Sequence, residues 1–278
     1  MRRPIRSLCL AALLAAASLA HADIDRDSAE SLLRKSGVWE QLGAVAVQVE
    51  AGMQKAMRRA AAKPSEEEKA RIARVIQTAY AADRLRSVST SVLAARVQPE
   101  HLQALRSWFD SPLGAAVSRA EEATFAGDGN ANAAMKEGMQ LLAPMPIERR
   151  TLLEELLAAT RAAESMTQIA ISTTLAVHLG AASAMQPGPL PSEAGARAIL
   201  QAQRPQLLKT FTTLTLASFA RTYAQIPSED LRAYIAFARS PAGSAFNDAT
   251  LHALDAALTG AATDMGQHLP RARDDSRI

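Results

Sequence analysis

Two short stretches of sequence decide the fold. WFDSPLG, from Trp108 to Gly114, recurs 129 positions later as FARSPAG, from Phe237 to Gly243. In each stretch serine is a favoured N-cap, and proline is favoured at the first position of a helix. The residue before a proline is also pushed out of the helical conformation. Each stretch therefore predicts a corner where one helix ends and another begins, and the recurrence predicts that this corner is used twice.

Cap chemistry accounts for every residue type in the two copies. Glycine, which has no side chain, would let the preceding helix approach the backbone closely. The aromatic residue three positions before the serine would then pack over that spot. We interpret the motif as structural rather than functional. Its members are Trp108, Ser111, Pro112, Gly114, Phe237, Ser240, Pro241 and Gly243.

The sequence around the two stretches also repeats, in the same order. The matched pairs are Glu100 with Glu229, Leu102 with Leu231, Val97 with Ile226, Pro64–Glu66 with Pro191–Glu193, and the stretch from Leu32 with that from Leu156. Pro144 and Pro146 stop any helix between the copies. We therefore predict two helical modules, residues 23–146 and 147–270, followed by a flexible tail at 271–278.

The remaining periodicity is helical. From Ser28 to Met57, large apolar residues recur at steps of three and four as one apolar stripe. Pro64 breaks this pattern, and Ser65 then begins a second helix that runs to about Val97, with a glutamate in capping-box spacing. Pro99 begins a third helix. Since no alternating strand pattern appears, we predict an all-α fold, built as two tandem copies of a short helical module docked together.

The N-terminal 22 residues have the layout of a secretory signal peptide. Three arginines precede an apolar run from Leu8 to Leu19, and Ala20, His21 and Ala22 form a small-x-small cleavage site. The run is too short to anchor a chain in a bilayer. We predict cleavage after Ala22 and a periplasmic location.

Removal of this segment changes the charge of the chain. The full sequence has 31 basic and 28 acidic residues, but residues 1–22 hold three arginines and no acid, so the remainder has 28 of each. Nucleic-acid binding requires an excess of cations, and none is left. Cys9 is the only cysteine, so cysteine metal sites and thiol catalysis are not expected in the mature chain.

The acidic and amide residues of GDGNAN, from Gly127 to Asn132, resemble the start of a calcium loop. The sixth loop position needs glycine and is Ala133, and the twelfth needs glutamate and is Met139. Asp, Gly and Asn are also favoured turn residues. We predict a plain turn there, with no metal and no cofactor.

The histidines do not indicate catalysis either. No two stand at metal-ligand spacing, and His252 with Asp255 is more simply a surface pair on one helix face. His101, Asp110 and Ser111 have the residue types of a triad, but they lie within one short helix and its cap, where the serine oxygen is occupied. We expect no catalytic residues and no enzymatic activity. The mature chain's histidines are His101, His178, His252 and His268.

Residues 165–192 carry no charge. Alanine and hydroxyl residues interrupt the stretch, so no stable membrane span is expected in the mature chain. Two interpretations stay open. The first is a buried central helix of the second module with Ile169, Leu175 and Leu179 in its core, and the second is a surface for a membrane or partner. Because this helix face carries no charge, we expect it to dock the two modules to each other through a continuous interface.

The two corner motifs resemble the domain-of-unknown-function family 2059, a short helical periplasmic module. Its signature is an acidic-Leu start, an aromatic residue, and Ser-Pro-x-Gly. The two copies cover most of the mature chain, and the second departs by placing Ala238 where an aromatic residue is usual. The resemblance implies an exported helical protein, and it supplies no catalytic residues.

Three functions remain as expectations. The first is a non-enzymatic interaction or accessory protein that binds another envelope protein through helical faces. The second is a binder of an apolar ligand such as a lipid, which an exposed apolar patch or a cavity beside residues 165–192 would favour. The third is a hydrolase with a dispersed site, which needs a cleft that gathers histidines and carboxylates from both modules.

Overall fold

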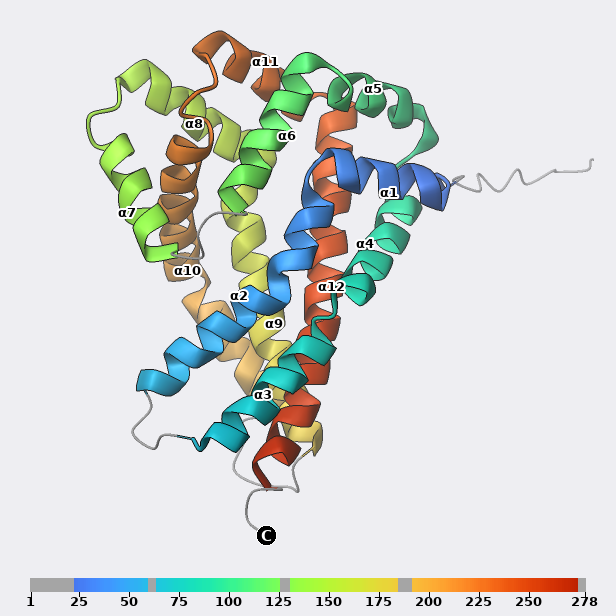
Figure 1. Cartoon of the computed structure of the whole chain (residues 1–278). Helices are drawn as coiled ribbons and strands as arrows, with labels where there is room; N and C mark the ends of the chain where they lie inside the picture. Colours follow the sequence, from blue (N-terminus) through green and yellow to red (C-terminus); the bar gives the residue numbers. More distant parts are fainter. Residues whose placement is uncertain (1–22, 60–63, 126–130, 185–191, 275–278) are drawn as a thin grey trace, which may run out of the picture.

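The computed structural model describes residues 23–59, 64–125, 131–184 and 192–274, and these residues form helices without a strand. The predicted all-α fold is confirmed. The first half of the chain contains α1 Arg26–Lys35, α2 Val38–Arg59, α3 Glu66–Ala79, α4 Ala82–Arg96, α5 Pro99–Phe109, α6 Pro112–Phe125 and α7 Ala131–Leu142 (Figure 1). The second half contains α8 Ile147–Thr160, α9 Ala162–Ala184, α10 Glu193–Thr222, α11 Ser228–Arg239 and α12 Pro241–Asp274.

Two of the expected helices are each divided in two. The stripe from Ser28 to Met57 spans α1 and α2, which meet at Gly37, whose φ is +75°. Glycine reaches this left-handed conformation without steric cost, so the chain can turn while the apolar spacing continues. The helix expected from Ser65 to Val97 is α3 and α4, and Ser65 caps α3 by accepting a hydrogen bond from the Glu68 N–H at 3.1 Å.

The turn between α8 and α9, like the turn at Gly37, contains a residue in the left-handed conformation. Arg161 ends α8 in the left-handed conformation, with φ of +51°, and α9 begins at the next residue. Among the described residues, Arg161 is the only non-glycine residue with a positive φ. Such a conformation is uncommon for a side chain of this size, so packing of α8 and α9 must hold it.

The two Ser-Pro corners join α5 to α6 and α11 to α12, and their geometry is the same. Ser111 Oγ accepts a hydrogen bond from the Gly114 N–H at 3.0 Å and donates one to the Trp108 carbonyl at 2.7 Å. Ser240 Oγ makes the equivalent bonds, to the Gly243 N–H at 3.0 Å and the Phe237 carbonyl at 2.7 Å.

Both glycines lie against the preceding helix. A Cβ atom on Gly114 would stand 2.0 Å from the Trp108 carbonyl oxygen, and one on Gly243 would stand 2.0 Å from the Phe237 carbonyl oxygen. The atom over each glycine is therefore the backbone oxygen of the aromatic residue rather than its ring. The rings turn toward each other instead: those of Trp108 and Phe237 stack with centroids 4.2 Å apart and planes 6° apart.

These two rings are both half-buried, whereas the leucines that precede them differ. Leu231 is fully buried in α11, but its counterpart Leu102 in α5 is only half-buried. The matched leucines of the repeat therefore do not occupy equivalent buried places, because Leu105 takes the fully buried place in α5.

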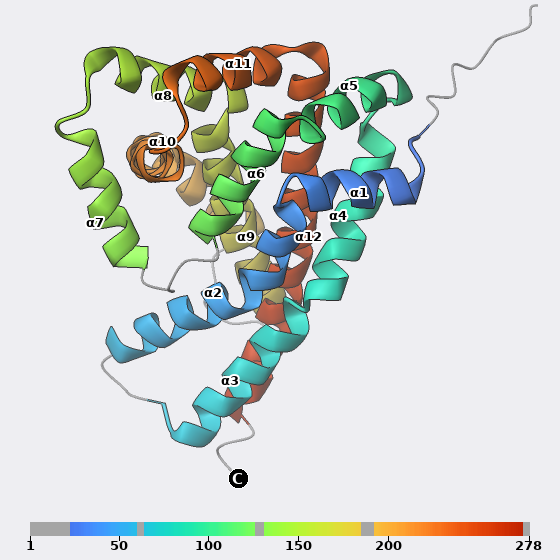
Figure 2. The ribbon, with the colours of Figure 1, turned by 45° about the horizontal axis from the view of Figure 1, so that its top comes forward.

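The two halves are interleaved rather than simply docked. The last helix, α12, packs against α9 of its own half and against α3 and α4 of the first half. Conversely, α10 of the second half packs against α6 and α7 of the first (Figure 2). One hydrophobic core joins Leu32 and Phe109 to Phe246 and Ala257, and the other joins Val117 to residues such as Leu156.

Connections differ between the halves. Where the first half has α3 and α4, the second has one helix, α10, and where the first has α6 and α7, the second has α12. Helix α12 continues to Asp274, four residues into the segment predicted as a tail. Of GDGNAN, residues 127–130 lie outside the described residues, and Asn132 is already in α7.

The uncharged stretch begins within α9, and its residues 185–191 lie outside the described part of the chain. Leu175 is buried as predicted, but Ile169 and Leu179 are only half-buried. A Cβ atom on Gly180 would lie 2.2 Å from the Thr263 carbonyl oxygen, so α9 and α12 touch backbone to backbone there. Among the described helices, none is long and apolar enough to cross a membrane.

Candidate functional site

An open groove lies between α2 and α3. The two helices meet where Gln77 Nε2 donates a hydrogen bond to Glu50 Oε2 at 2.9 Å, and the groove opens from there toward the ends of the helices at Arg58 and Pro64. Its volume is about 740 Å³. The lining residues are Glu50, Met53, Gln54, Met57, Arg58, Pro64, Glu66, Lys69, Ala70, Ile72, Ala73 and Ile76.

The floor of the groove is apolar. Ile72 and Ile76 stand one turn apart on α3 and are buried against the core, while Met53 and Met57 stand one turn apart on α2 and are half-buried. The sequence pattern placed these methionines in an ordinary core stripe. Methionine side chains are flexible and polarizable, and they suit surfaces that must fit an apolar partner.

Charged residues of both signs edge the groove. Glu50 and Arg58 stand on the α2 side, and Glu66 and Lys69 pair with each other on the α3 side. The Glu66–Lys69 pair is exposed, and its side chains are 89% and 40% accessible. An ion pair so open to water contributes little to stability, so both groups can turn toward a bound partner at small cost.

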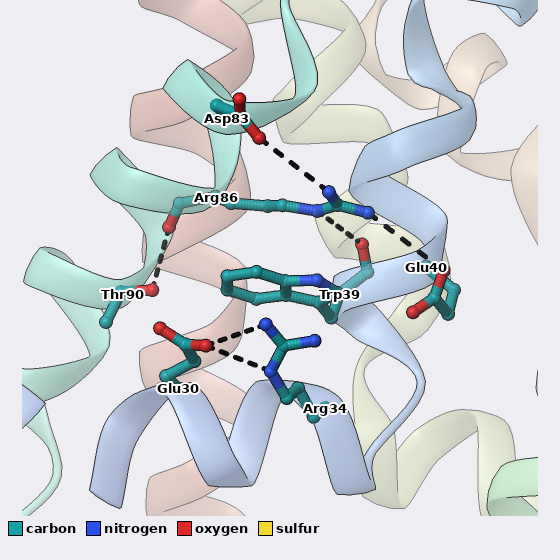
Figure 3. Close-up of polar contacts among 7 residues, drawn as sticks. All are labelled: Glu30, Arg34, Trp39, Glu40, Asp83, Arg86 and Thr90. Atoms are coloured by element: carbon teal, nitrogen blue, oxygen red, sulfur yellow. Dashed lines mark hydrogen bonds and ion pairs between the residues drawn. The ribbon is translucent and has the colours of Figure 1, made fainter. Parts of the chain in front are cut away.

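A cation–π sandwich fixes the other end of α2. The Trp39 ring lies between two guanidinium groups, with Arg34 Cζ 3.9 Å and Arg86 Cζ 4.8 Å from its centroid (Figure 3). Arg34 comes from α1 and Arg86 from α4, so the ring ties three helices together. Both faces of the ring are covered, which leaves neither open for a stacking ligand.

Further contacts hold the two guanidinium groups in place. Arg34 donates two hydrogen bonds to Glu30 Oε1, at 2.7 and 2.9 Å, and Arg86 Nε donates one to the Trp39 carbonyl at 3.1 Å (Figure 3). A Cβ atom on Gly43 would stand 2.8 Å from Arg86 Nη2, so the arginine also lies close over the α2 backbone. The direction in which α2 leaves the core, and with it the groove, follows from these contacts.

Among the described residues, the titratable groups with the most strongly perturbed pKa values lie elsewhere, between the two halves. Glu121 of α6 accepts hydrogen bonds from the Tyr223 hydroxyl at 2.6 Å and from the Tyr234 hydroxyl at 3.0 Å. Burial raises the pKa of the Glu121 carboxyl, the two hydroxyl hydrogen bonds oppose this increase, and the charge of Glu122 adds to it. Burial, followed by the charge of Glu121, raises the pKa of both tyrosines well above the usual value.

Aromatic rings surround this carboxyl. The Tyr234 ring stacks on Trp108 with centroids 5.6 Å apart, and the Tyr223 ring meets Tyr234 and Phe219 edge to face. Perturbed carboxyls can mark active sites. Here, however, none of these residues lines the groove, and the hydroxyls that could serve chemistry are bonded to the carboxyl. We interpret the cluster as a polar tie between α6, α10 and α11.

The other titratable candidates from the sequence are not brought together. Asp110 pairs with Lys35, and Ser111 Oγ is occupied by its two backbone partners. His252 Nδ1 lies 2.7 Å from the Asp248 carbonyl oxygen, one turn earlier on the same helix. No group of three His, Cys, Asp or Glu residues that could hold a metal occurs among the described residues.

Sequence reasoning missed the groove and the Glu121 cluster for different reasons. The groove depends on how far α2 and α3 diverge, which the spacing of apolar residues does not specify. Glu121 and Tyr223 are 102 positions apart, and no motif links them. Two of the chain's three tyrosines bind this one carboxyl, but neither stands near it in the sequence, so no sequence signal points to the cluster.

No known family model matches the chain, no curated protein matches it, and no solved structure matches it. The resemblance to family 2059 therefore rests on the two corner motifs.

Proposed function

We propose that this chain is an exported, non-enzymatic binding protein of the cell envelope. It accepts the apolar face of an amphipathic helix from a partner envelope protein in the α2–α3 groove. The observation that carries this proposal is the groove itself, which has an apolar floor of Met53, Met57, Ile72 and Ile76 and an edge of exposed charges. Docking of an amphipathic helix into such a groove is a recurring mode of recognition.

The dimensions of the groove favour a helix. Its α3 wall runs from Glu66 to Ile76, ten positions, which corresponds to roughly 15 Å or nearly three helical turns. A helix about 10–12 Å across would lie partly in this space, with its charged face outside. Charges of both signs at the edge suit such a face, since Arg58 and Glu66 can each pair with an opposite charge on the partner.

An apolar small molecule such as a lipid is the second candidate occupant. The volume of about 740 Å³ lies within the range of small-molecule sites, roughly 300–1,000 Å³. This groove lies on the first half, whereas the sequence-based argument for a lipid looked to a patch or cavity beside residues 165–192. A hydrolase finds no support there, because the lining contains no histidine and comes from α2, α3 and the turn before α3.

The proposal includes the export and duplication inferred from the sequence. Asp25 caps α1 by accepting a hydrogen bond from the Ser28 N–H at 2.7 Å, so the first helix begins directly after the proposed cleavage at Ala22. The duplication is supported by the matching Ser111 and Ser240 corners and by the left-handed turn at Gly37 and at Arg161.

Site-specific photo-crosslinking in the native periplasm tests the groove. A photo-crosslinking amino acid is placed at Ala73, which lines the groove, and in a matched control at the neighbouring Arg74, which is exposed and does not line it. We expect an adduct from position 73 that position 74 does not give. The captured segment should be an amphipathic helix, and a synthetic peptide of it should lose affinity for a Met57→Glu variant.

Native mass spectrometry of the protein from the same periplasm distinguishes the second candidate. If the parent carries a bound lipid and the Met57→Glu variant does not, the occupant of the groove is an apolar ligand and not a partner helix. Two results together would refute both forms of the proposal. They are equal amounts of adduct from positions 73 and 74, and a native mass without any bound ligand for both the parent and the Met57→Glu variant.

A further inference from the structure

The turn between α7 and α8 forms an exposed apolar tip. We define the tip as residues 139–147, MQLLAPMPI, which contain no charged residue and one polar side chain, Gln140. Both views place the α7–α8 turn at the edge of the molecule, away from the α2–α3 groove (Figures 1 and 2). The tip is thus independent of the proposed groove function.

Large apolar side chains point to solvent there. Ile147 is 68% exposed, Met139 45% and Leu141 38%. Ala143 and the two prolines of the tip are exposed as well. Isolated exposed apolar residues are normal on protein surfaces, but a contiguous group marks a site of interaction.

The N–H groups of the turn between α7 and α8 are satisfied. The Ala143 N–H donates to the Met139 carbonyl at 3.2 Å, and the Met145 N–H donates to the Leu142 carbonyl at 3.3 Å. Pro144 and Pro146 have no N–H to satisfy. Unsatisfied backbone groups are what prevents irregular segments from entering lipid, and here the amides of the turn between the two helices are satisfied.

Basic residues surround the tip. Lys136 stands one turn before it on α7, and Arg149 and Arg150 follow it on α8. Arg149 donates to the carbonyls of Tyr223 and Ile226, both at 2.6 Å, and Arg150 donates to the Leu142 carbonyl at 2.8 Å, so both are held beside the tip. Along the chain from Lys136 to Arg150 there are three basic residues and two acids, Glu137 and Glu148, and Glu137 is paired with Arg221. Basic residues therefore exceed acids by one in the stretch that contains the tip.

The size of the tip favours a bilayer over a protein partner. A stable protein interface buries about 800 Å² on each side. The exposed residues of the tip come from a single turn and offer roughly a few hundred Å² at most. A bilayer has no shape that must be matched, and its anionic headgroups attract cations next to an inserted apolar segment.

We propose that the tip inserts shallowly into the interface of an anionic bilayer, with Lys136 and Arg150 against the headgroups. The protein thereby binds a membrane surface peripherally and reversibly. The groove between α2 and α3 stays outside the bilayer.

The absence of cysteine after Cys9 makes a direct test possible. The chain from Asp23 onward, which contains every described helix, is labelled with a polarity-sensitive fluorophore through Ile147→Cys. The matched control is Ile199→Cys on α10, which is 53% exposed. Vesicles contain about three parts phosphatidylcholine to one part phosphatidylglycerol, or phosphatidylcholine alone. We expect the label at 147, and not that at 199, to brighten with the anionic vesicles.

Unlabelled variants give a second measurement. Replacement of two exposed residues, Leu141→Gln with Ile147→Gln, should lower binding to sedimented anionic vesicles by about tenfold or more, while Ile199→Gln leaves it unchanged. Equal responses from both labels, or no response from either, would overturn the proposal. It also fails if the chain self-associates without vesicles and the Leu141→Gln, Ile147→Gln variant makes it monomeric, because the tip would then be a protein contact.

Discussion

Replacement of Gly243 by alanine tests whether the Ser-Pro corner depends on a bare backbone. In this variant the new Cβ atom would stand 2.0 Å from the Phe237 carbonyl oxygen and 2.9 Å from the Phe237 carbonyl carbon. Both atoms belong to the backbone, so neither can swing aside as the end of a side chain could. Either α11 or the first turn of α12 must move, and the Ser240 cap moves with it.

The matched control lies on the same helix. A Cβ atom on Gly260 of α12 would have no neighbouring atom within 4 Å. Alanine there gains helix propensity of about 1 kcal/mol, which should raise the melting temperature by about 2–4 °C for a chain of this size. Overpacking at position 243 should lower the free energy of unfolding by about 1–3 kcal/mol, and the melting temperature by roughly 2–10 °C.

Thermal melts followed by circular dichroism and chemical denaturation measure both variants against the parent. The expected result is a pair of shifts of opposite sign, and Gly114→Ala should behave like Gly243→Ala because its Cβ atom would stand 2.0 Å from the Trp108 carbonyl oxygen. A leucine at either corner should destabilise at least as much. If Gly243→Ala and Gly260→Ala melt at the same temperature, the close approach does not constrain the corner.

Three further predictions follow from other contacts. Because the pKa of Glu121 is raised above its ordinary value of 4.5, its contribution to stability is largest below that pH and is lost as the pH rises through the raised pKa. Glu121→Gln should therefore gain in stability relative to the parent as the pH rises from about 4 to about 7 in denaturation curves, and a constant difference would contradict this. Gly138→Ala, whose Cβ atom would stand 2.2 Å from the Ala217 carbonyl oxygen, should destabilise the protein by about 1–3 kcal/mol, whereas Gly52→Ala, which has open space, should not. Trp39→Leu removes a ring that both Arg34 and Arg86 cover, and should cost about 1–3 kcal/mol in the same assay; an unchanged midpoint would show that the sandwich does not anchor α2.

Local chemistry could be predicted from the sequence where neighbouring residues decide it. The caps at Ser65 and Ser111 and the start of α5 at Pro99 follow from residue types within a few positions. The break at Gly37 was missed because the apolar stripe continues through it, and periodicity alone does not register a turn. Helix α12 runs into the predicted tail because polar residues after Arg271 can extend a helix that is already packed upstream.

The groove and the Glu121 cluster lay beyond sequence reasoning because both depend on how helices cross. Apolar spacing identifies which face of α2 is buried, but Met53 and Met57 can cover a core or line a groove with the same spacing. Likewise, nothing near Glu121 in the sequence indicates that tyrosines from α10 and α11 reach it. Long-range geometry of this kind becomes visible only once the crossing of the halves is known.

The exchange of helices between the halves has a consequence for how the chain acquires its structure. The core around Leu32, Ile76 and Leu93 is completed by α12 of the other half, and the ion pair of Arg84 with Asp264 spans 180 positions. Contacts of such high sequence separation slow folding, because the intervening chain must be ordered before they form. The core of the N-terminal half is therefore complete only once α12 has been synthesised and has packed against it.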